Sequence, residues 1–96
     1  MAKATLEIYA KREYASGEIV EMTVWRLPAT NSERPHGLKY SLYYGRDGKR
    51  IVGYDNERGK GDHRHIREIE EDYAFTTIER LIADFMESVE KIGGLI

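Results

Sequence analysis

The sequence of 96 residues contains no cysteine, and it contains no hydrophobic run long enough to cross a membrane. The missing cysteines exclude disulfides, cysteine nucleophiles and thiolate metal ligands, and they fit a reducing compartment. The first four residues, Met-Ala-Lys-Ala, lack the apolar segment that a secretory signal needs. We therefore expect a cytoplasmic protein with no membrane partner.

The chain also has too few residues for a second core. A chain of this length forms a single small domain, residues 1–96, and buries about 60 to 65% of its unfolded surface. Hydrophobic residues make up 41% of the sequence and charged residues 33%, a balance typical of a folded domain rather than a disordered one. One modest core leaves little room for an enclosed active site.

The formal net charge of -2 conceals an uneven distribution of charge along the chain. Residues 46–67 carry seven lysines and arginines against four acidic residues, whereas residues 68–96 carry two against eight. A basic segment next to an acidic one can place opposite potentials on two surfaces, of which one suits a polyanion and the other a basic partner. The alternative is that the two segments neutralise each other within the fold.

Most of the chain before residue 57 has the patterns of β-strands. Alternating apolar residues, β-branched residues and turn signals predict four strands, at residues 5–13, 19–27, 38–44 and 50–56. Residues 28–37 contain both prolines and read as a surface loop. Residues 63–66 fit either a short fifth strand or a continuation of a loop.

The last part of the chain has the pattern of an amphipathic helix. Thr76 is its predicted N-cap, with Glu79 three residues later as in a capping box. Apolar residues recur at spacings of three and four from Ile78 to Ile92 and form one stripe that must pack on the sheet. Strands followed by a helix predict an α+β domain, with an antiparallel sheet of four to five strands and one long C-terminal helix packed on one face.

The most unusual segment is the run from Asp55 to His65, which contains no Leu, Ile, Val, Phe or Met. Such a run cannot build a core, so its residues must reflect turn chemistry, solvation or a functional site. If His63 and His65 lie in extended chain, both imidazoles point to one face and Arg64 points to the other. The histidine pair is therefore the centre of the predicted site.

Paired imidazoles that titrate near neutrality can supply a general base and a general acid, as metal-independent RNA cleavage requires. One removes the proton of a ribose 2′-hydroxyl, and the other protonates the departing 5′-oxygen. Glu57 and Asp62 are further catalytic candidates, as a base or as groups that orient a histidine. Four cations are candidates for binding the phosphate: Arg50, Arg58, Lys60 and Arg64.

The same two histidines could instead bind a metal ion, with a third ligand from Asp55, Glu57 or Asp62. Many surface histidine pairs share this spacing, so we favour metal-free chemistry and expect neither a metal nor another cofactor. Asp55 is retained as an accessory candidate for the site.

Two further interpretations need no chemistry. The polar run could be a solvated loop whose acidic and basic residues pair with each other. The protein could also be a binding module, in which the basic loop and the strand tyrosines engage nucleic acid or a protein partner without cleavage. His36, between Pro35 and Gly37, is an ordinary loop histidine unless its loop folds over the strand ends, in which case it is a second accessory candidate.

Three blocks of the sequence resemble a known family: Trp-Arg-Leu-Pro at 25–28, His-Gly-Leu-Lys-Tyr at 36–40, and Gly-Tyr-Asp-Asn-Glu-Arg-Gly-Lys-Gly-Asp-His-Arg-His at 53–65. With these blocks the chain resembles, over almost its whole length, the TumE-like toxins of prokaryotic toxin-antitoxin modules. The resemblance implies a small intracellular toxin that a DNA-binding, helix-turn-helix antitoxin neutralises by direct contact. Toxins of this general kind often act on RNA or translation, so RNA is the expected target.

The resemblance carries no catalytic role to particular residues, so the roles given above rest on the residue types and their spacing. A homodimer is the expected form if the protein oligomerises, because small domains with exposed sheet edges often pair.

Overall fold

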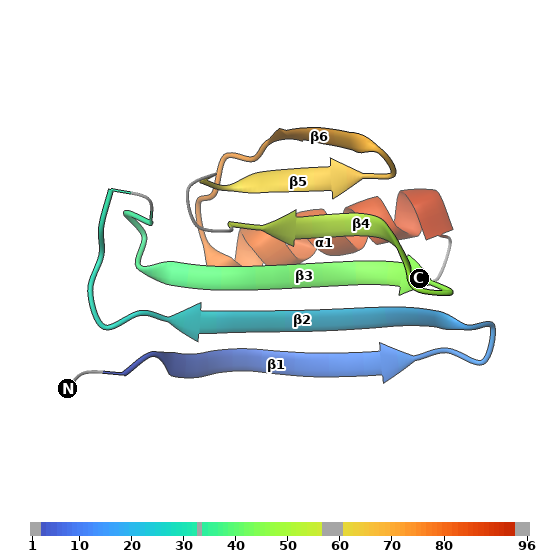
Figure 1. Ribbon diagram of the computed structural model, residues 1–96, viewed down its shortest axis with the longest axis horizontal. Coiled ribbons are helices and arrows are strands. Elements are labelled where there is room, and N and C mark those ends of the chain that lie inside the picture. The colour runs from blue at the N-terminus through green and yellow to red at the C-terminus, as the bar shows by residue number, and fades with distance from the viewer. Residues whose placement is uncertain (1–2, 33, 57–60, 94–96) are drawn as a thin grey trace.

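In the computed structural model, the described residues (3–32, 34–56 and 61–93) form one antiparallel sheet of six strands and one helix (Figure 1). Each strand pairs with its neighbours in the sequence, so the sheet order follows the chain order. The elements are β1 (Thr5–Glu13), β2 (Glu18–Arg26), β3 (Leu38–Arg46), β4 (Lys49–Asp55), β5 (His63–Ile66), β6 (Ile69–Asp72) and α1 (Ile78–Gly93).

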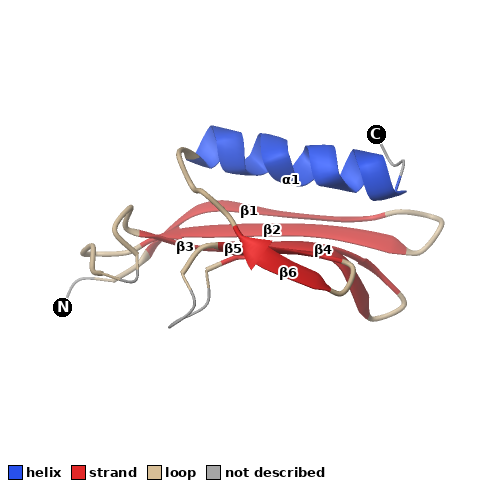
Figure 2. Ribbon diagram, turned by 90° about the horizontal axis from the view of Figure 1, so that it is seen from above, coloured by secondary structure: helices blue, strands red, loops and turns tan. Residues whose placement is uncertain are grey.

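The core lies between α1 and one face of the sheet, as Figure 2 shows from above. Alternate residues of β3 point into it because successive side chains of a strand face opposite ways. The buried residues of the sheet are Val20, Val24, Leu38, Tyr40, Leu42, Tyr44, Val52 and Tyr54. The helix contributes Leu81, Phe85 and Val89. The predicted α+β class and the predicted docking of the helix stripe are therefore confirmed.

The opposite face of the sheet is not covered by α1 (Figure 2). Register partners on neighbouring strands form rows across this face. One row contains Tyr9, Thr23, Ser41, Asp55 and His63, which are register partners on β1 to β5. The next row contains Glu21, Tyr43, Gly53, His65 and Glu70 on β2 to β6. We call this surface the open face.

The sheet has one strand more than the upper limit of four to five that the sequence predicts. Residues 63–66 do form a strand, and β6 follows it after a two-residue turn. Arg67 in this turn has a φ of 57°, a left-handed conformation that glycine or asparagine would signal in a sequence. Most of β6 consists of the acidic residues Glu70, Glu71 and Asp72, which have low strand propensity. The sequence therefore gives no recognisable signal for the turn or for β6.

The N-cap of α1 is Thr77 rather than the predicted Thr76. The hydroxyl oxygen of Thr77 accepts a hydrogen bond from the Arg80 N–H at 3.0 Å, and its carbonyl oxygen accepts one from the Leu81 N–H at 2.9 Å. Glu79 therefore stands one position too early for a capping box. Within the described residues, no helix is long and apolar enough to cross a membrane.

Candidate functional site

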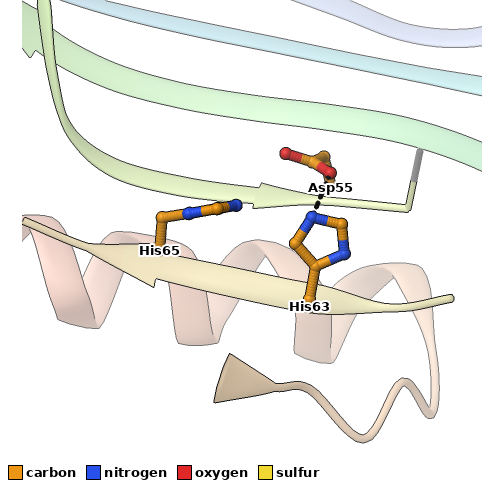
Figure 3. Close-up of side chains that lie close together, drawn as sticks. All are labelled: Asp55, His63 and His65. Atoms are coloured by element: carbon orange, nitrogen blue, oxygen red, sulfur yellow. Dashed lines mark ion pairs between the residues drawn. The ribbon is translucent and has the colours of Figure 1, made fainter. Parts of the chain in front are cut away.

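The end of β4 and the start of β5 bring three of the predicted site residues together on the open face (Figure 3). Asp55 and His63 are register partners, and His65 follows two residues later on the same face. The two imidazole centroids lie 5.1 Å apart, and one ligand atom from each of the three residues lies within 4.8 Å of the others. The prediction that both imidazoles share a face is confirmed.

His63 is held by acceptors at both ring nitrogens, and only 5% of its side chain is exposed. Its Nδ1 lies 3.0 Å from the carbonyl oxygen of Gly61. Its Nε2 lies 2.8 Å from Asp55 Oδ1 and 3.5 Å from Glu70 Oε2. A carbonyl oxygen can only accept, so Nδ1 must carry a hydrogen.

Gly61 directs its carbonyl to this nitrogen from a backbone conformation that suits glycine. Its φ is 68°, which lies in the left-handed region that side chains with a Cβ disfavour. Gly61 lies two residues before the start of β5 and orients the first imidazole of that strand.

His65 contacts Glu70 of β6, with 2.9 Å between Nε2 and Oε2. Burial, together with the charge of Arg50, lowers the pKa of the His65 imidazole. We call Asp55, His63, His65 and Glu70 the open-face cluster. Glu70 was not among the predicted residues, since its position depends on β6, which the sequence does not signal.

Arg50 lies beside the open-face cluster because position 53 is glycine. A Cβ at Gly53 would lie 2.6 Å from Arg50 Cδ, so the arginine side chain occupies that space. Its guanidinium Nη1 is 4.0 Å from Asp55 Oδ2, and 41% of the side chain is exposed. Of the predicted phosphate ligands, Arg50 is therefore on the same face as the histidines.

Arg64 points to the other face, as expected for the residue between the two histidines. Its Nε lies 2.6 Å from Glu71 Oε1, and its Nη1 donates to the Tyr54 hydroxyl at 3.4 Å. It lines a pocket of about 440 Å³ beside α1, together with Asp84 and Lys91. Arg64 is thus separated from the histidine pair by the sheet.

Asp62 and His36 belong to a second cluster, on the side of the sheet that carries α1. His36 Nε2 lies 2.9 Å from Asp62 Oδ1, and the Tyr40 hydroxyl donates to the same oxygen at 2.7 Å. The Leu38 N–H donates to His36 Nδ1 at 3.1 Å, and the Phe75 ring lies 4.2 Å from the imidazole centroid. We call His36, Tyr40, Asp62 and Phe75 the helix-side cluster.

The predicted catalytic set is therefore divided between two places. His63 and His65 converge with Asp55, whereas Asp62 pairs with His36 and Tyr40. Glu57, Arg58 and Lys60 lie outside the described residues. The catalytic and phosphate-binding roles of all these side chains stay predictions.

The open-face cluster has the composition of a metal-binding or an acid-base site. Two imidazoles and a carboxylate are the protein ligands of many zinc and non-haem iron centres. The same groups, without a metal, can accept and donate protons near neutrality.

Comparison with protein families gives a match over most of the chain. A family model described as Toxin TumE matches residues 2–92. Neither the curated proteins nor the solved structures gave a significant match.

Proposed function

The chain belongs to the TumE toxin family, and we propose that it acts on RNA by cleaving phosphodiester bonds at the open-face cluster. Its general role is that of a toxin component of a toxin-antitoxin module. The observation that supports RNA cleavage is the convergence of His63 and His65 with Asp55, next to the cation Arg50.

The proposed reaction is an internal transfer at phosphorus. The ribose 2′-oxygen loses its proton to a base and attacks phosphorus, and the bond from phosphorus to the 5′-oxygen breaks. An acid donates a proton to that oxygen, so the products are a 2′,3′-cyclic phosphate and a 5′-hydroxyl, with no change in charge or oxidation state. Arg50 would bind the phosphate, whose negative charge increases at the transition state.

His65 is the imidazole that we assign to contact with substrate, because it is more exposed than His63. The exposed fractions of the two side chains are 16% and 5%. In the metal-independent mechanism, His65 and His63 exchange protons with the substrate, with Asp55 orienting His63. In the metal-dependent alternative, the two imidazoles hold an ion instead. Arg64 faces α1 and has no role in either mechanism.

The rest of the open face supports a single-stranded substrate. Tyr9 and Trp25 stand on it with 56% and 37% of their surface exposed, and Lys39 is the register partner of Trp25. Exposed aromatic residues on a sheet can stack on unpaired bases, and lysines can contact the backbone phosphates. RNA lying across the strands would pass from Trp25 towards the histidine pair.

A toxin of this family has an antitoxin as its general partner. We propose that the antitoxin is a helix-turn-helix protein, as the sequence resemblance implies, and that it blocks the open face. A homodimer stays a prediction.

The first test is expression in a bacterial host, where the unchanged protein should arrest growth. The double change His63→Ala with His65→Ala should relieve the arrest, and His36→Gln should not. Circular dichroism of the purified variants checks that each is folded. A folded double variant that remains fully toxic would show that the histidine pair is not the site.

A non-enzymatic binding module is the alternative function, favoured by the exposed aromatic residues of the open face. Purified protein incubated with total RNA separates the two. Fragments with 2′,3′-cyclic phosphate ends support cleavage, whereas a stable complex with intact RNA supports the module.

A further inference from the structure

A neutral imidazole has one N–H, but His63 faces an oxygen acceptor at each of its two ring nitrogens. Nδ1 carries the hydrogen because it faces the carbonyl oxygen of Gly61. Nε2 then presents a lone pair to Asp55 Oδ1 at 2.8 Å, with Glu70 Oε2 at 3.5 Å. Lone pairs that face each other at such distances repel, so a proton or a cation must lie between them.

His36 provides an internal comparison in which one proton is enough. The Leu38 N–H donates to His36 Nδ1, so Nε2 carries the hydrogen and donates it to Asp62. Neutral His36 is therefore satisfied at both nitrogens. The distance from Nε2 to the carboxylate is almost the same in the two pairs, 2.9 Å and 2.8 Å, but only the His36 pair needs no further charge.

The positions of the ligand atoms, rather than the protonation of His63, point to a metal ion. His65 Nε2 lies 2.9 Å from Glu70 Oε2, the oxygen that also faces His63 Nε2. Three ligand atoms, from Asp55, His63 and His65, lie within 4.8 Å of one another. This spacing allows one metal ion to be bound by all three groups.

We infer that Asp55, His63 and His65 bind a divalent transition-metal ion, with Zn²⁺ as the ion that fits best. Two imidazoles and one carboxylate form the open three-ligand set of catalytic zinc sites, in which water or substrate takes the fourth position. Zinc-ligand bonds of about 2.0 to 2.2 Å separate tetrahedral ligands by about 3.3 Å, so the side chains need only small shifts to close on the ion. Mg²⁺ prefers oxygen ligands and suits this set poorly.

His63 has the outer hydrogen bond that is common among metal-binding histidines. Metal-binding histidines commonly donate their other ring N–H to a backbone carbonyl, which fixes the tautomer and the ring orientation. Gly61 provides that carbonyl for His63. Glu70 lies at the exposed side of the site, where 46% of its side chain is accessible.

The role of the ion in RNA cleavage rests on the proposed function, but its binding does not. An ion here would lower the pKa of a bound water or 2′-hydroxyl, or polarise the phosphate oxygens. Binding is measured on the protein alone, so the two proposals can fail separately.

The experiment is a calorimetric titration of the full chain with ZnCl₂ after chelator treatment and removal of the chelator. We expect one Zn²⁺ per chain for the unchanged protein. His65→Ala and Asp55→Asn should each weaken binding more than about 100-fold, since even the loss of a group that only orients a metal ligand costs 10- to 100-fold. His36→Gln and Asp62→Asn alter the same residue types on the other side of the sheet and should bind as tightly as the unchanged protein.

Thermal unfolding with and without Zn²⁺ provides a second measurement, because an ion that binds only the folded state raises the midpoint. His63→Ala removes a buried side chain, and this variant could fail to fold for that reason alone. In that case the test rests on His65→Ala and Asp55→Asn. The inference is overturned if the unchanged protein binds no Zn²⁺, if it binds Mg²⁺ equally well, or if the open-face variants bind as tightly as the helix-side ones. Zinc binding without any RNA cleavage would retain this inference and reject the proposed function.

Discussion

Two histidine-aspartate pairs of nearly equal length lie on opposite sides of the same sheet. His36 and Asp62 are 2.9 Å apart in the helix-side cluster, and His63 and Asp55 are 2.8 Å apart in the open-face cluster. They differ at the far nitrogen of the ring, which meets a backbone N–H in the first pair and a backbone carbonyl in the second. The direction of one backbone hydrogen bond thus separates a closed structural network from a pair that needs a proton or a cation.

The helix-side pair is tied to Tyr40 and Phe75, which belong to other segments of the chain. Asp62 accepts hydrogen bonds from both His36 and Tyr40, and Phe75 packs on the imidazole just before α1 begins. These contacts join the loop before β3, the segment before β5 and the segment before α1. A change here should therefore affect stability, and a change in the open-face cluster should affect chemistry.

The largest expected difference is in RNA cleavage. Replacing both open-face imidazoles, His63→Ala with His65→Ala, should lower the cleavage rate about 100- to 10,000-fold, the range for loss of general acid-base catalysis. His36→Gln should leave the rate unchanged, because His36 does not contact the open face. The rates are measured with a fluorescent RNA under single-turnover conditions. Equal losses in the two variants would remove the distinction between the clusters.

The second difference is in the free energy of unfolding, which a change in the helix-side cluster should lower more than a change in the open-face cluster. Asp62→Ala leaves the Tyr40 hydroxyl and the His36 N–H without their acceptor, which should cost about 1 to 3 kcal/mol of unfolding free energy. Asp55→Asn should cost less than this in chelator-treated protein, because the new amide can donate to His63 Nε2. Urea unfolding of both variants gives the comparison. A larger loss for Asp55→Asn would contradict the assignment of the His63 tautomer.

A smaller difference is expected in RNA binding, between the predicted phosphate ligands Arg50 and Arg64. Arg50→Ala should weaken RNA binding about tenfold, near the low end of the about 1.5 to 3 kcal/mol that a hydrogen bond to a charged group contributes, because 41% of the Arg50 side chain is exposed. It should also reduce the salt dependence of binding. Arg64→Ala removes a cation that is paired with Glu71 on the other face and should have little effect on either property. Filter binding at several salt concentrations tests this, and a stronger effect at Arg64 would move the RNA to the helix side.

The smallest effect concerns alkaline pH. Burial and the hydrogen bond to Asp62 raise the pKa of the Tyr40 hydroxyl far above its ordinary value. The folded state therefore keeps this proton while the unfolded chain loses it, so the contribution of Tyr40 to stability is present below about pH 10 and is lost as the pH rises further. Tyr40→Phe should reduce the decline in unfolding free energy between about pH 9 and pH 11, which urea titrations can measure. An unchanged decline would show that other tyrosines cause it.

The sequence predicts those features that depend on short-range periodicity. Alternation places His63 and His65 on one face and Arg64 on the other, and spacings of three and four identify the buried stripe of α1. The choice among Asp55, Glu57 and Asp62 as the partner of the histidines does not follow from periodicity. It depends on the register between β4 and β5, which puts Asp55 directly opposite His63.

Other features depend on positions that the sequence marks ambiguously or not at all. Two adjacent threonines precede α1, and only the hydrogen bonds of Thr77 identify the cap. Glu70 joins the cluster through β6, a strand with one apolar residue after a turn that contains no glycine. His36 reaches Asp62 across 26 positions of sequence, a separation at which local patterns carry no information.

The sheet order, which follows the chain order, has a consequence for the timing of synthesis. A ribosome produces the chain from its N-terminus, so Asp55, His63 and Glu70 are all made before Ile78, the first residue of α1. The segment that carries the open-face cluster therefore leaves the ribosome before the helix that completes the core. The buried residues of the sheet therefore have no helix to pack against until Leu81, Phe85 and Val89 have also been made.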